Sequence, residues 1–173
     1  MAKGHGVDRI VSLLQSLGCA NVFVNIGGEI RATGDKGTAG PWRAGVERPD
    51  EQISILLFPV ALHDQAIATS GDYRNFFEVE GKRYSHTIDP RTGRPVTHQL
   101  ASVSVVADNC MIADGWATAL NVLGRGKAHG WRSYFDWMPT CWNAWRIDIS
   151  RSLLVALSNG ANRNNLLLYE LYQ

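Results

Sequence analysis

The chain has 173 residues, of which 45% are hydrophobic and 19% charged, and this is the composition of an ordinary globular protein of one domain. Its 17 Lys and Arg nearly balance its 16 Asp and Glu, so charge gives no reason to expect nucleic acid or an anionic membrane surface as a partner. No apolar run approaches the roughly 20 residues of a membrane span, and the cysteines form no Cys-x-x-Cys zinc motif or disulfide framework: Cys19, Cys110 and Cys141.

A helix is predicted from Asp8 to Leu17. Its apolar positions recur at spacings of three and four residues, and Gly18 suits the left-handed position after its end. Asp8 would then lie in or just before the first turn, where free backbone N–H groups gather. A plain N-cap therefore explains Asp8 without any ligand.

Strands are predicted next, from the β-branched run Asn21–Ile26 and from the segment that resumes at Glu29. Gly27 and Gly28 separate them. Paired glycines let another backbone or a ligand approach closely, and a simple bulge needs them equally. Trp42–Val46 and Ile53–Phe58 are further strand candidates, with Asp35–Pro41 as a Gly-rich connection. No glycine run has the spacing of a P-loop or of a Rossmann cofactor site.

The stretch from Ala66 to Val96 is dense in hydroxyl groups, charged side chains and turn-forming residues. A hairpin is predicted over Glu78–Ile88, with Glu80-Gly81 as its turn. The period of two would place Tyr84, His86 and Ile88 on one strand face. Asp89-Pro90 would begin a further turn, in which Gly93 takes a positive φ.

His86 and Asp89 are candidate functional residues, because they would lie at a strand end beside a loop rich in backbone donors. Local hydrogen bonding explains Ser70, Asp72 and Asp89 equally well, since Asp and Ser commonly satisfy their own turns. His86 can likewise be an ordinary surface histidine. The residue types alone leave both interpretations open.

A strand is predicted over Leu100–Ala107, followed by a helix from about Met111 to Leu123 that stops at Gly124. Asp114 and Thr118 are four residues apart and so lie on one side of that helix. Their oxygens suit a hard cation such as Mg²⁺. A Thr bonded back to the preceding turn is the common structural alternative.

The predicted fold class is α+β, with a mixed or antiparallel sheet and the two helices packed on it. The sheet would be built from residues 21–33, 42–60, 66–90 and 100–107. From Arg125 onward neither structural period is clear, so 153–157 and 166–171 can be short helices or strands.

Five ordered motifs resemble the ApbE family, the FAD:protein FMN transferases. They are Lys-Gly-His-Gly-Val-Asp at 3–8, Gly-Gly-Glu-Ile at 27–30, Ala-Thr-Ser-Gly-Asp-Tyr at 68–73, His-Thr-Ile-Asp-Pro-Arg-Thr-Gly-Arg-Pro at 86–95 and Ala-Asp-Gly-Trp-Ala-Thr-Ala-Leu at 113–120. The resemblance covers about residues 2–124, so it implies a main unit, 1–124, and an atypical tail of unassigned structure, 125–173. Members of this family are about twice as long, so it implies an incomplete ApbE-like flavin transferase fold that corresponds to the C-terminal part of the family domain.

The resemblance also implies roles for particular residues. Asp114 and Thr118 would coordinate Mg²⁺ together with the backbone carbonyl of Ala2. At His5 the family usually has Tyr or Phe. His86 and Asp89 are candidate bases for an acceptor hydroxyl, by position and titration range. The residues implied to bind the flavin nucleotide are Lys3, His5, Asp8, Gly27, Gly28 and Ile88.

By resemblance, the function is Mg²⁺-dependent transfer of FMN from FAD to a Ser or Thr hydroxyl of an acceptor flavoprotein, with release of AMP. Hydrolysis of FAD to FMN and AMP is a rival within the family, and a non-catalytic flavin-binding or interaction module is a rival outside the enzymes. Family members are commonly periplasmic and lipid-anchored through an N-terminal cysteine. The first twenty residues here lack the apolar core of a signal peptide, so localisation stays open, as does a homo-oligomer.

Overall fold

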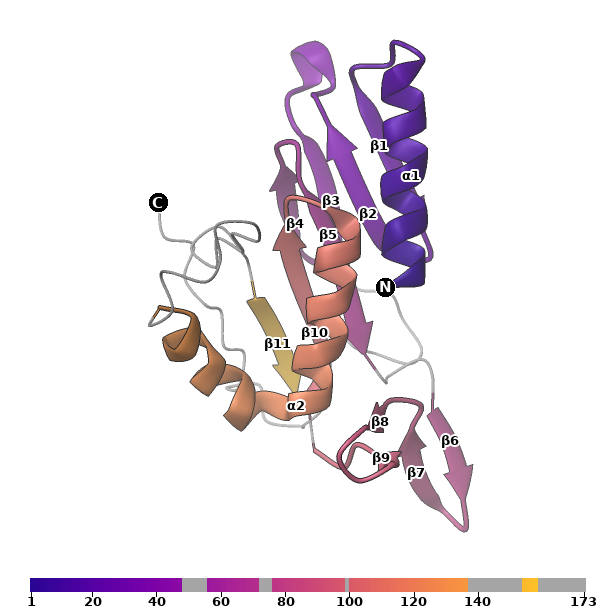
Figure 1. Ribbon diagram of the computed structural model, residues 1–173, viewed down its shortest axis with the longest axis vertical. Helices are drawn as coiled ribbons and strands as arrows, with labels where there is room; N and C mark the ends of the chain where they lie inside the picture. The colour runs from indigo at the N-terminus through magenta and orange to yellow at the C-terminus, as the bar shows by residue number, and fades with distance from the viewer. Residues whose placement is uncertain (48–55, 72–75, 99, 137–153, 159–173) are drawn as a thin grey trace.

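The computed structural model describes residues 1–47, 56–71, 76–98, 100–136 and 154–158 (Figure 1). A five-stranded sheet forms its centre, with the order β1-β2-β5-β10-β11 and antiparallel pairing throughout. These strands are β1 Val22–Ile26, β2 Glu29–Thr33, β5 Ala66–Gly71, β10 Leu100–Ala107 and β11 Leu154–Ser158. The helices are α1 Ala2–Ser16 and α2 Cys110–Asp136.

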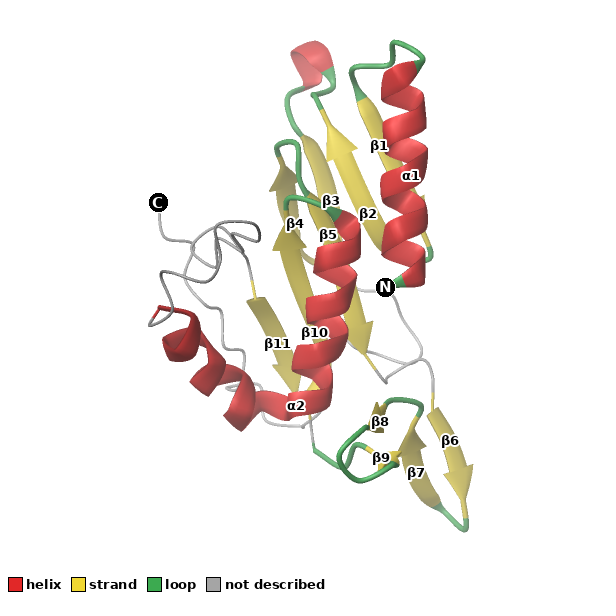
Figure 2. Ribbon diagram, in the orientation of Figure 1, coloured by secondary structure: helices red, strands yellow, loops and turns green. Residues whose placement is uncertain are grey.

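The two helices cover one face of the sheet, and a ribbon of β3 (Trp42–Glu47) and β4 (Leu56–Leu62) covers the other (Figure 2). Apolar clusters fill both interfaces. The helix side holds Val7, Val11, Val22, Ala66 and Cys110 under α1, and Leu100, Val103, Val105, Ala117 and Leu120 under α2. The ribbon side holds Ile30, Ala32, Ala44, Val46, Leu62, Ile67 and Val106. The predicted α+β class with helices packed on an antiparallel sheet is confirmed. The predicted membership of the sheet is wrong for 42–60 and for the part of 66–90 after β5, because β3–β4, β6–β7 and β8–β9 form separate two-stranded sheets.

The predicted strands are found with small changes of boundary. The strand Leu100–Ala107 has the predicted bounds, and all but its last residue is buried. The β4 strand begins at Leu56 and runs to Leu62, whereas residues 48–55 lie outside the described part. Residues 154–157 of the 153–157 segment lie in strand β11, which pairs with β10, whereas 153 and 166–171 lie outside the described residues. The Gly-rich connection contains one short 3₁₀ turn, η1, at Gly37–Ala39.

The predicted start of the first helix is wrong, because α1 begins at Ala2 and not at Asp8. Gly4 and Gly6 lower helix propensity and so hid this first turn from the sequence pattern. Gly4 is buried where α1 crosses α2. A Cβ there would lie 2.7 Å from the Cys110 carbonyl carbon and 2.9 Å from the Asp114 Cβ, so glycine lets the two helices approach closely.

Helix α2 follows the predicted helix up to Gly124, where φ is 72° and ψ is 167° and the helical geometry is broken. The expected stop is therefore present. Beyond it the backbone becomes helical again and continues to Asp136, which the sequence pattern did not predict. None of the described helices has the length and apolarity that a membrane crossing needs.

The predicted hairpin forms from β6 (Phe76–Val79) and β7 (Lys82–Ser85), and Glu80 and Gly81 take positive φ in its turn. The expected common strand face is wrong, however, because β7 ends at Ser85. The Ser85 hydroxyl accepts the Thr87 N–H at 3.1 Å and turns the chain before β8 (Ile88–Asp89) pairs with β9 (Arg94–Pro95). His86 therefore lies in a connection and Ile88 in a separate short strand.

Candidate functional site

The carboxylate of Asp114, in the second turn of α2, is buried at the N-terminus of α1. Its side chain is 6% exposed, and its Oδ2 accepts the Gly4 N–H at 2.9 Å. Gly4 is the third residue of α1, and its N–H is one of those that a helix leaves without an internal partner. The Met1 ammonium also pairs with this Oδ2, at 2.7 Å. A buried carboxylate requires such compensation, and here it receives both a helix N–H and a cation.

Thr118 lies one turn further along α2. Its hydroxyl donates to the Asp114 carbonyl at 3.0 Å and is 3.0 Å from the Ser70 hydroxyl on β5. The back-bonded threonine that the sequence left open as an alternative is therefore present. It does not exclude metal binding, because both hydroxyl oxygens keep acceptor lone pairs.

The donor set around Asp114 fits a hard cation. Carboxylate, hydroxyl and carbonyl oxygens are the ligands that Mg²⁺ prefers, and the Asp114 carboxylate and the Thr118 hydroxyl lie one helical turn apart. Ala2, whose carbonyl is the third expected ligand, opens α1 next to Met1. The described residues contain no cluster of three or more His, Cys, Asp or Glu that could hold a metal. The magnesium assignment to Ala2, Asp114 and Thr118 stays a prediction.

Asp8 caps a helix, but the helix is α2 and not its own. One carboxylate oxygen accepts the Cys110 N–H at 2.9 Å and the other accepts the Met111 N–H at 2.8 Å. The Arg31 guanidinium on β2 donates to the first of these oxygens at 2.8 Å. The expectation that Asp8 lies at the start of its own helix is wrong because α1 begins six residues earlier. The flavin-binding role of Asp8 stays a prediction.

Lys3, Gly27 and Glu29 come together beside α1. The Lys3 ammonium pairs with the Glu29 Oε1 at 2.7 Å, and a Cβ on Gly27 would lie 3.8 Å from the Lys3 side chain. Gly27 and Gly28 have φ of 59° and 99° and form the two-residue turn of the β1–β2 hairpin, so neither is part of a bulge. A Cβ on Gly28 would meet nothing within 4 Å, so no backbone in the described part of the chain approaches it closely. His5 is exposed on α1.

Sequence reasoning missed several polar residues in this region. Glu29 is 3% exposed, and its Oε2 finds no hydrogen-bond partner among the described residues. Arg31 shares the strand face of Glu29, so the period of two could have paired them. Asn121 is 1% exposed, with Nδ2 donating to the Ser70 carbonyl at 3.5 Å and Oδ1 unpartnered in the described part. Its spacing of three residues from Thr118 was the available signal.

Cys110 lies close enough to several of these charged side chains to be affected by their charges. Its thiol is buried, and burial, followed by the negative charges of Asp8, Glu29 and Asp114, raises its pKa to about 12, although Arg31 opposes the rise. The thiol is therefore protonated at neutral pH. Since the thiolate is the nucleophilic form, Cys110 is a packing residue.

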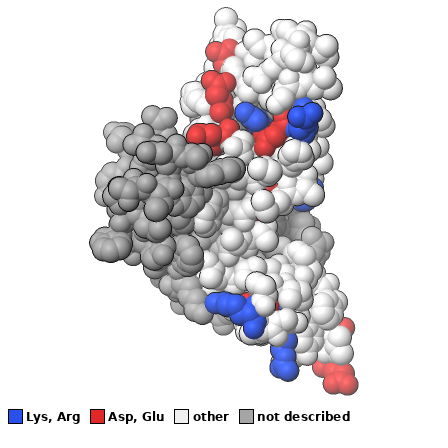
Figure 3. All heavy atoms as spheres, viewed as in Figure 1, with Lys and Arg blue, Asp and Glu red and all other residues white. Residues whose placement is uncertain are grey.

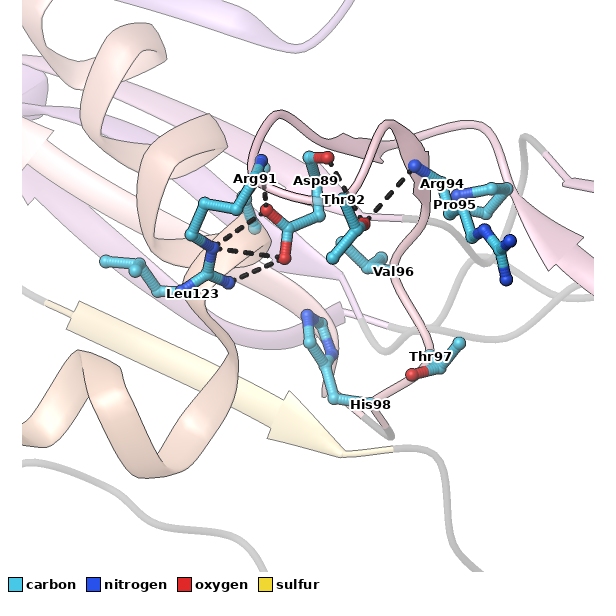
Figure 4. A pocket seen from close by; sticks show the side chains of 10 residues that line it. Asp89, Arg91, Thr92, Arg94, Pro95, Val96, Thr97, His98 and Leu123 are labelled. Atoms are coloured by element: carbon cyan, nitrogen blue, oxygen red, sulfur yellow. Dashed lines mark hydrogen bonds and ion pairs between the residues drawn. The ribbon is translucent and has the colours of Figure 1, made fainter.

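The other candidate residues lie at the opposite end of the first part of α2. His86 is exposed between β7 and β8, and Ile88 is also exposed. Asp89 lines a pocket that also includes Leu123 (Figure 4). Leu123 is nine residues after Asp114, or about 13 Å along a helix. The structure therefore does not gather His86 and Asp89 into one cluster with Asp114.

Asp89 satisfies its own turn, as the simpler interpretation expected. Its Oδ1 accepts the Arg91 N–H at 2.9 Å, and its carboxylate takes a two-pronged ion pair from the Arg91 guanidinium, with a shortest contact of 2.6 Å. The hydrogen bond and the charge of Asp89 in turn raise the pKa of Arg91. A carboxylate held in this way is a weak candidate for a base. Asp72 lies outside the described residues.

Charged side chains of both signs are interspersed on the face that carries the helices, and neither sign dominates the described part of that face (Figure 3). This distribution agrees with the formal charge of +1. The surface shown therefore offers no broad field of one sign that would attract a polyanion.

Comparisons with known proteins identify close relatives. Residues 1–136 match the model of the ApbE family. A protein named FAD:protein FMN transferase from Vibrio cholerae is 50% identical over 130 residues, which are 74% of this chain and 39% of the relative. One from Klebsiella pneumoniae is 40% identical over 128 residues, which are 74% of this chain and 37% of the relative. The chain thus spans less than half the length of these relatives.

Solved structures agree with the sequence comparison. The structure of the flavin transferase ApbE from Vibrio cholerae has a TM-score of 0.72 and 38% identity, and the match covers 93% of this chain and 46% of that one. The ApbE protein from Thermotoga maritima has a TM-score of 0.71 and 31% identity, with 91% of this chain and 46% of that one covered.

Proposed function

Because the chain belongs to the ApbE family, we propose that it supplies part of an FAD:protein FMN transferase that requires Mg²⁺. The reaction would move the FMN moiety of FAD to a Ser or Thr hydroxyl of an acceptor flavoprotein and release AMP. The observation that carries the proposal is the buried Asp114 carboxylate, which lies one turn before the Thr118 hydroxyl. Relatives that bear this activity by name are 33% to 50% identical to the matched residues.

The residues around Asp114 would bind the cation and the flavin nucleotide. Asp114, Thr118 and the Ala2 carbonyl would hold Mg²⁺, which when bound neutralises charge that develops on the pyrophosphate. Lys3 would attract the same phosphates, since its ammonium is half-exposed beside Glu29. The remaining flavin contacts would come from His5, Asp8, Gly27, Gly28 and Ile88.

The chemical step would be an in-line displacement at phosphorus. A bond forms between the acceptor hydroxyl oxygen and the FMN phosphorus, the bond from that phosphorus to the AMP oxygen breaks, and the hydroxyl proton passes to a base. His86 and Asp89 are the candidates for that base, and Asp89 also forms the ion pair with Arg91. Asp89 would position the loop that carries both residues.

The proposed unit is residues 1–124, with 125–173 as a tail. The broken helical geometry at Gly124 supports this boundary, although β11 from the tail adds a strand to the central sheet. Because the chain spans 39% of the Vibrio cholerae relative, a non-catalytic FAD-binding module is the second candidate function.

A chimera tests the proposed activity. Residues 1–124 of this chain replace the matching segment of the Vibrio cholerae relative, and mass spectrometry follows FMN attached to an acceptor flavoprotein supplied with FAD. We expect attachment that needs Mg²⁺ and that stops when the target Ser or Thr of the acceptor is changed to Ala. Release of free FMN and AMP without attachment would favour FAD hydrolysis. A folded chimera that binds FAD and does neither would support the non-catalytic module.

A further inference from the structure

A pocket of about 310 Å³ lies between the β8–β9 loop and the last turn of α2 before Gly124 (Figure 4). Its described walls are of two kinds. Pro95, Val96, Val122 and Leu123 form an apolar side, and Asp89, Arg91, Thr92, Arg94, Thr97 and His98 contribute polar groups. A pocket with an apolar wall and a few convergent polar groups has the general composition of a small-molecule site.

His98 presents an unused donor at this pocket. Its Nδ1 accepts the Leu100 N–H at 3.3 Å, so in the neutral imidazole the proton belongs on Nε2. The Nε2 atom is buried and has no hydrogen-bond partner in the described part of the chain. The ring is also fixed in place, because it packs against the backbone of Gly124, where a Cβ would lie 2.7 Å from His98 Cδ2. Buried donors are normally satisfied, so this one indicates a missing acceptor.

The charges around the pocket favour a negative ligand. Asp89 is the one acidic side chain among its described lining residues, and Arg91 neutralises it through the two-pronged ion pair. Arg94 is exposed at the rim, and its guanidinium makes no hydrogen bond or ion pair with the described residues. One positive charge is therefore left over next to the unused imidazole N–H.

We propose that this pocket binds an oxyanion, the phosphate or carboxylate group of a molecule whose body lies against Val96 and Leu123. The His98 Nε2–H and the Arg94 guanidinium would donate to its oxygens. Charge-assisted bonds from arginine are the strong ones in such sites. The pocket is about 13 Å along α2 from Asp114, so this binding is separate from the proposed metal site.

Nuclear magnetic resonance of the ¹⁵N-labelled 173-residue chain tests the proposal directly. The ring nitrogens of His98 are followed while sodium phosphate, AMP or N-acetyl-aspartate amide is added at constant ionic strength. We expect a saturable shift of Nε2 with phosphate. Tighter binding of AMP would identify a nucleotide phosphate as the source, and tighter binding of the aspartate derivative would identify a peptide carboxylate.

Matched variants separate this site from general charge attraction. Arg94→Gln should weaken phosphate binding about tenfold, because it removes one charge-assisted donor, whereas Arg43→Gln on the exposed β3 surface should leave it unchanged. His98→Asn keeps an acceptor for the Leu100 N–H and should abolish binding, and His98→Gln restores a donor near Nε2 and should recover part of it. A shift that never saturates, or equal weakening by Arg94→Gln and Arg43→Gln, would overturn the proposal.

Discussion

Each of the two helices carries an aspartate that caps the N-terminus of the other helix. Asp114 of α2 accepts an N–H from the first turn of α1, and Asp8 of α1 accepts two N–H groups from the first turn of α2. Each helix N-terminus thus receives the carboxylate of the other helix, which compensates both its free N–H groups and its positive dipole end. The same two residues are the ones that the family resemblance assigns to metal and flavin.

For Asp8, this geometry predicts a structural contribution that can be measured without any ligand. We expect Asp8→Ala to lower the free energy of unfolding by about 3 kcal/mol, because two helix N–H groups and the Arg31 guanidinium lose their buried acceptor. Urea unfolding of the purified chain measures this. Asp108→Ala, an exposed aspartate just before α2, is the control and should change stability by less than about 0.5 kcal/mol. Equal stability of the two variants would contradict the capping role.

Replacing Asp114 by Asn separates the proposed role of its charge in metal binding from the role of its oxygen in capping α1. Asp114→Asn keeps an oxygen for the Gly4 N–H but removes the charge for Mg²⁺, so in the chimera we expect FMN transfer to fall by at least about a hundredfold while the chain stays folded. Circular dichroism and the transfer assay at several Mg²⁺ concentrations provide the measurement. Unchanged turnover at saturating Mg²⁺ would remove the metal assignment.

The raised pKa of Cys110 predicts both its reactivity and the direction of a pH effect. With Cys141→Ser in the background, iodoacetamide at pH 8 should label exposed Cys19 and leave Cys110 unmodified, since a pKa near 12 instead of 9.0 lowers the thiolate fraction roughly a thousandfold. The unfolded thiol loses its proton near pH 9.0 and the folded one does not. Its contribution to stability is therefore constant at neutral pH and falls as pH rises above about 9. Rapid labelling of both thiols in the folded chain would refute the burial argument.

At the scale of elements, the contact between α1 and α2 determines how the site is assembled. Val7 and Val11 of α1 belong to the same apolar cluster as Cys110 of α2. Gly4 lets the backbones of the two helices come close together beside Asp114. Residues more than a hundred positions apart thereby become neighbours. The position of the Asp114 carboxylate depends on this one close approach.

Two glycines in α1 give a matched test of that contact. Gly4→Ala places a methyl group 2.7 Å from the Cys110 carbonyl carbon and should destabilise the chain by about 2 kcal/mol or more, because the helices must move apart. Gly6→Ala has its nearest contact at an ordinary 3.9 Å, from Ile26 Cδ1, and should raise stability by about 0.5 kcal/mol through helix propensity. Thermal unfolding distinguishes the two. A gain in stability of equal size in both variants would show that helix propensity, and not the contact with α2, determines the effect.

The sequence predicted the elements that have strong local signals. Leu100–Ala107 is apolar at most positions and packs on both sheet faces, and the Glu80-Gly81 pair has the φ angles of a tight hairpin turn, so both were placed correctly. The start of α1 could not be found in this way. Gly4 weakens the local helix signal for the sake of a contact with α2 that is visible only in three dimensions.

The candidate site was predictable in part, for a related reason. Asp114 and Thr118 share a helix side, as their spacing of four indicated. The partners of Asp8 and the burial of Glu29 could not be predicted, because a charged side chain is expected on the surface unless its partner is known. The bend after Ser85 separated His86 from the strand face on which the period of two had placed it.

At the scale of the whole molecule, the chain corresponds to less than half of the relatives it matches, and α1 bears exposed apolar side chains on its outer side at Ile10, Leu13 and Leu17. Spacings of three and four residues align these side chains in one stripe. Exposed apolar surface of this kind promotes association with whatever apolar surface is available.

The isolated 173-residue chain should therefore bind FAD weakly and transfer FMN negligibly, although Asp8, Asp114 and Thr118 are all present. A misplacement of the substrate by about 1 Å can cost on the order of a hundredfold in rate, so correct ligands do not suffice where the walls that orient it are incomplete. FAD fluorescence titration and mass spectrometry of an acceptor test this, with the full-length Vibrio cholerae relative as the positive control. Micromolar binding with steady transfer would show that the whole site lies within these residues.

The exchange of carboxylates between the helices also imposes an order of events during translation. The Gly4 N–H and the Asp114 carboxylate that accepts it are 110 residues apart, and ribosomes add roughly 5 to 20 residues per second, so α1 waits about 5 to 20 s for the acceptor at its N-terminus. A helix of 15 residues with two glycines is not stable alone over that interval. The nascent segment will therefore remain open to chaperones until residue 114 has left the ribosome, and α1 and α2 will become helical together.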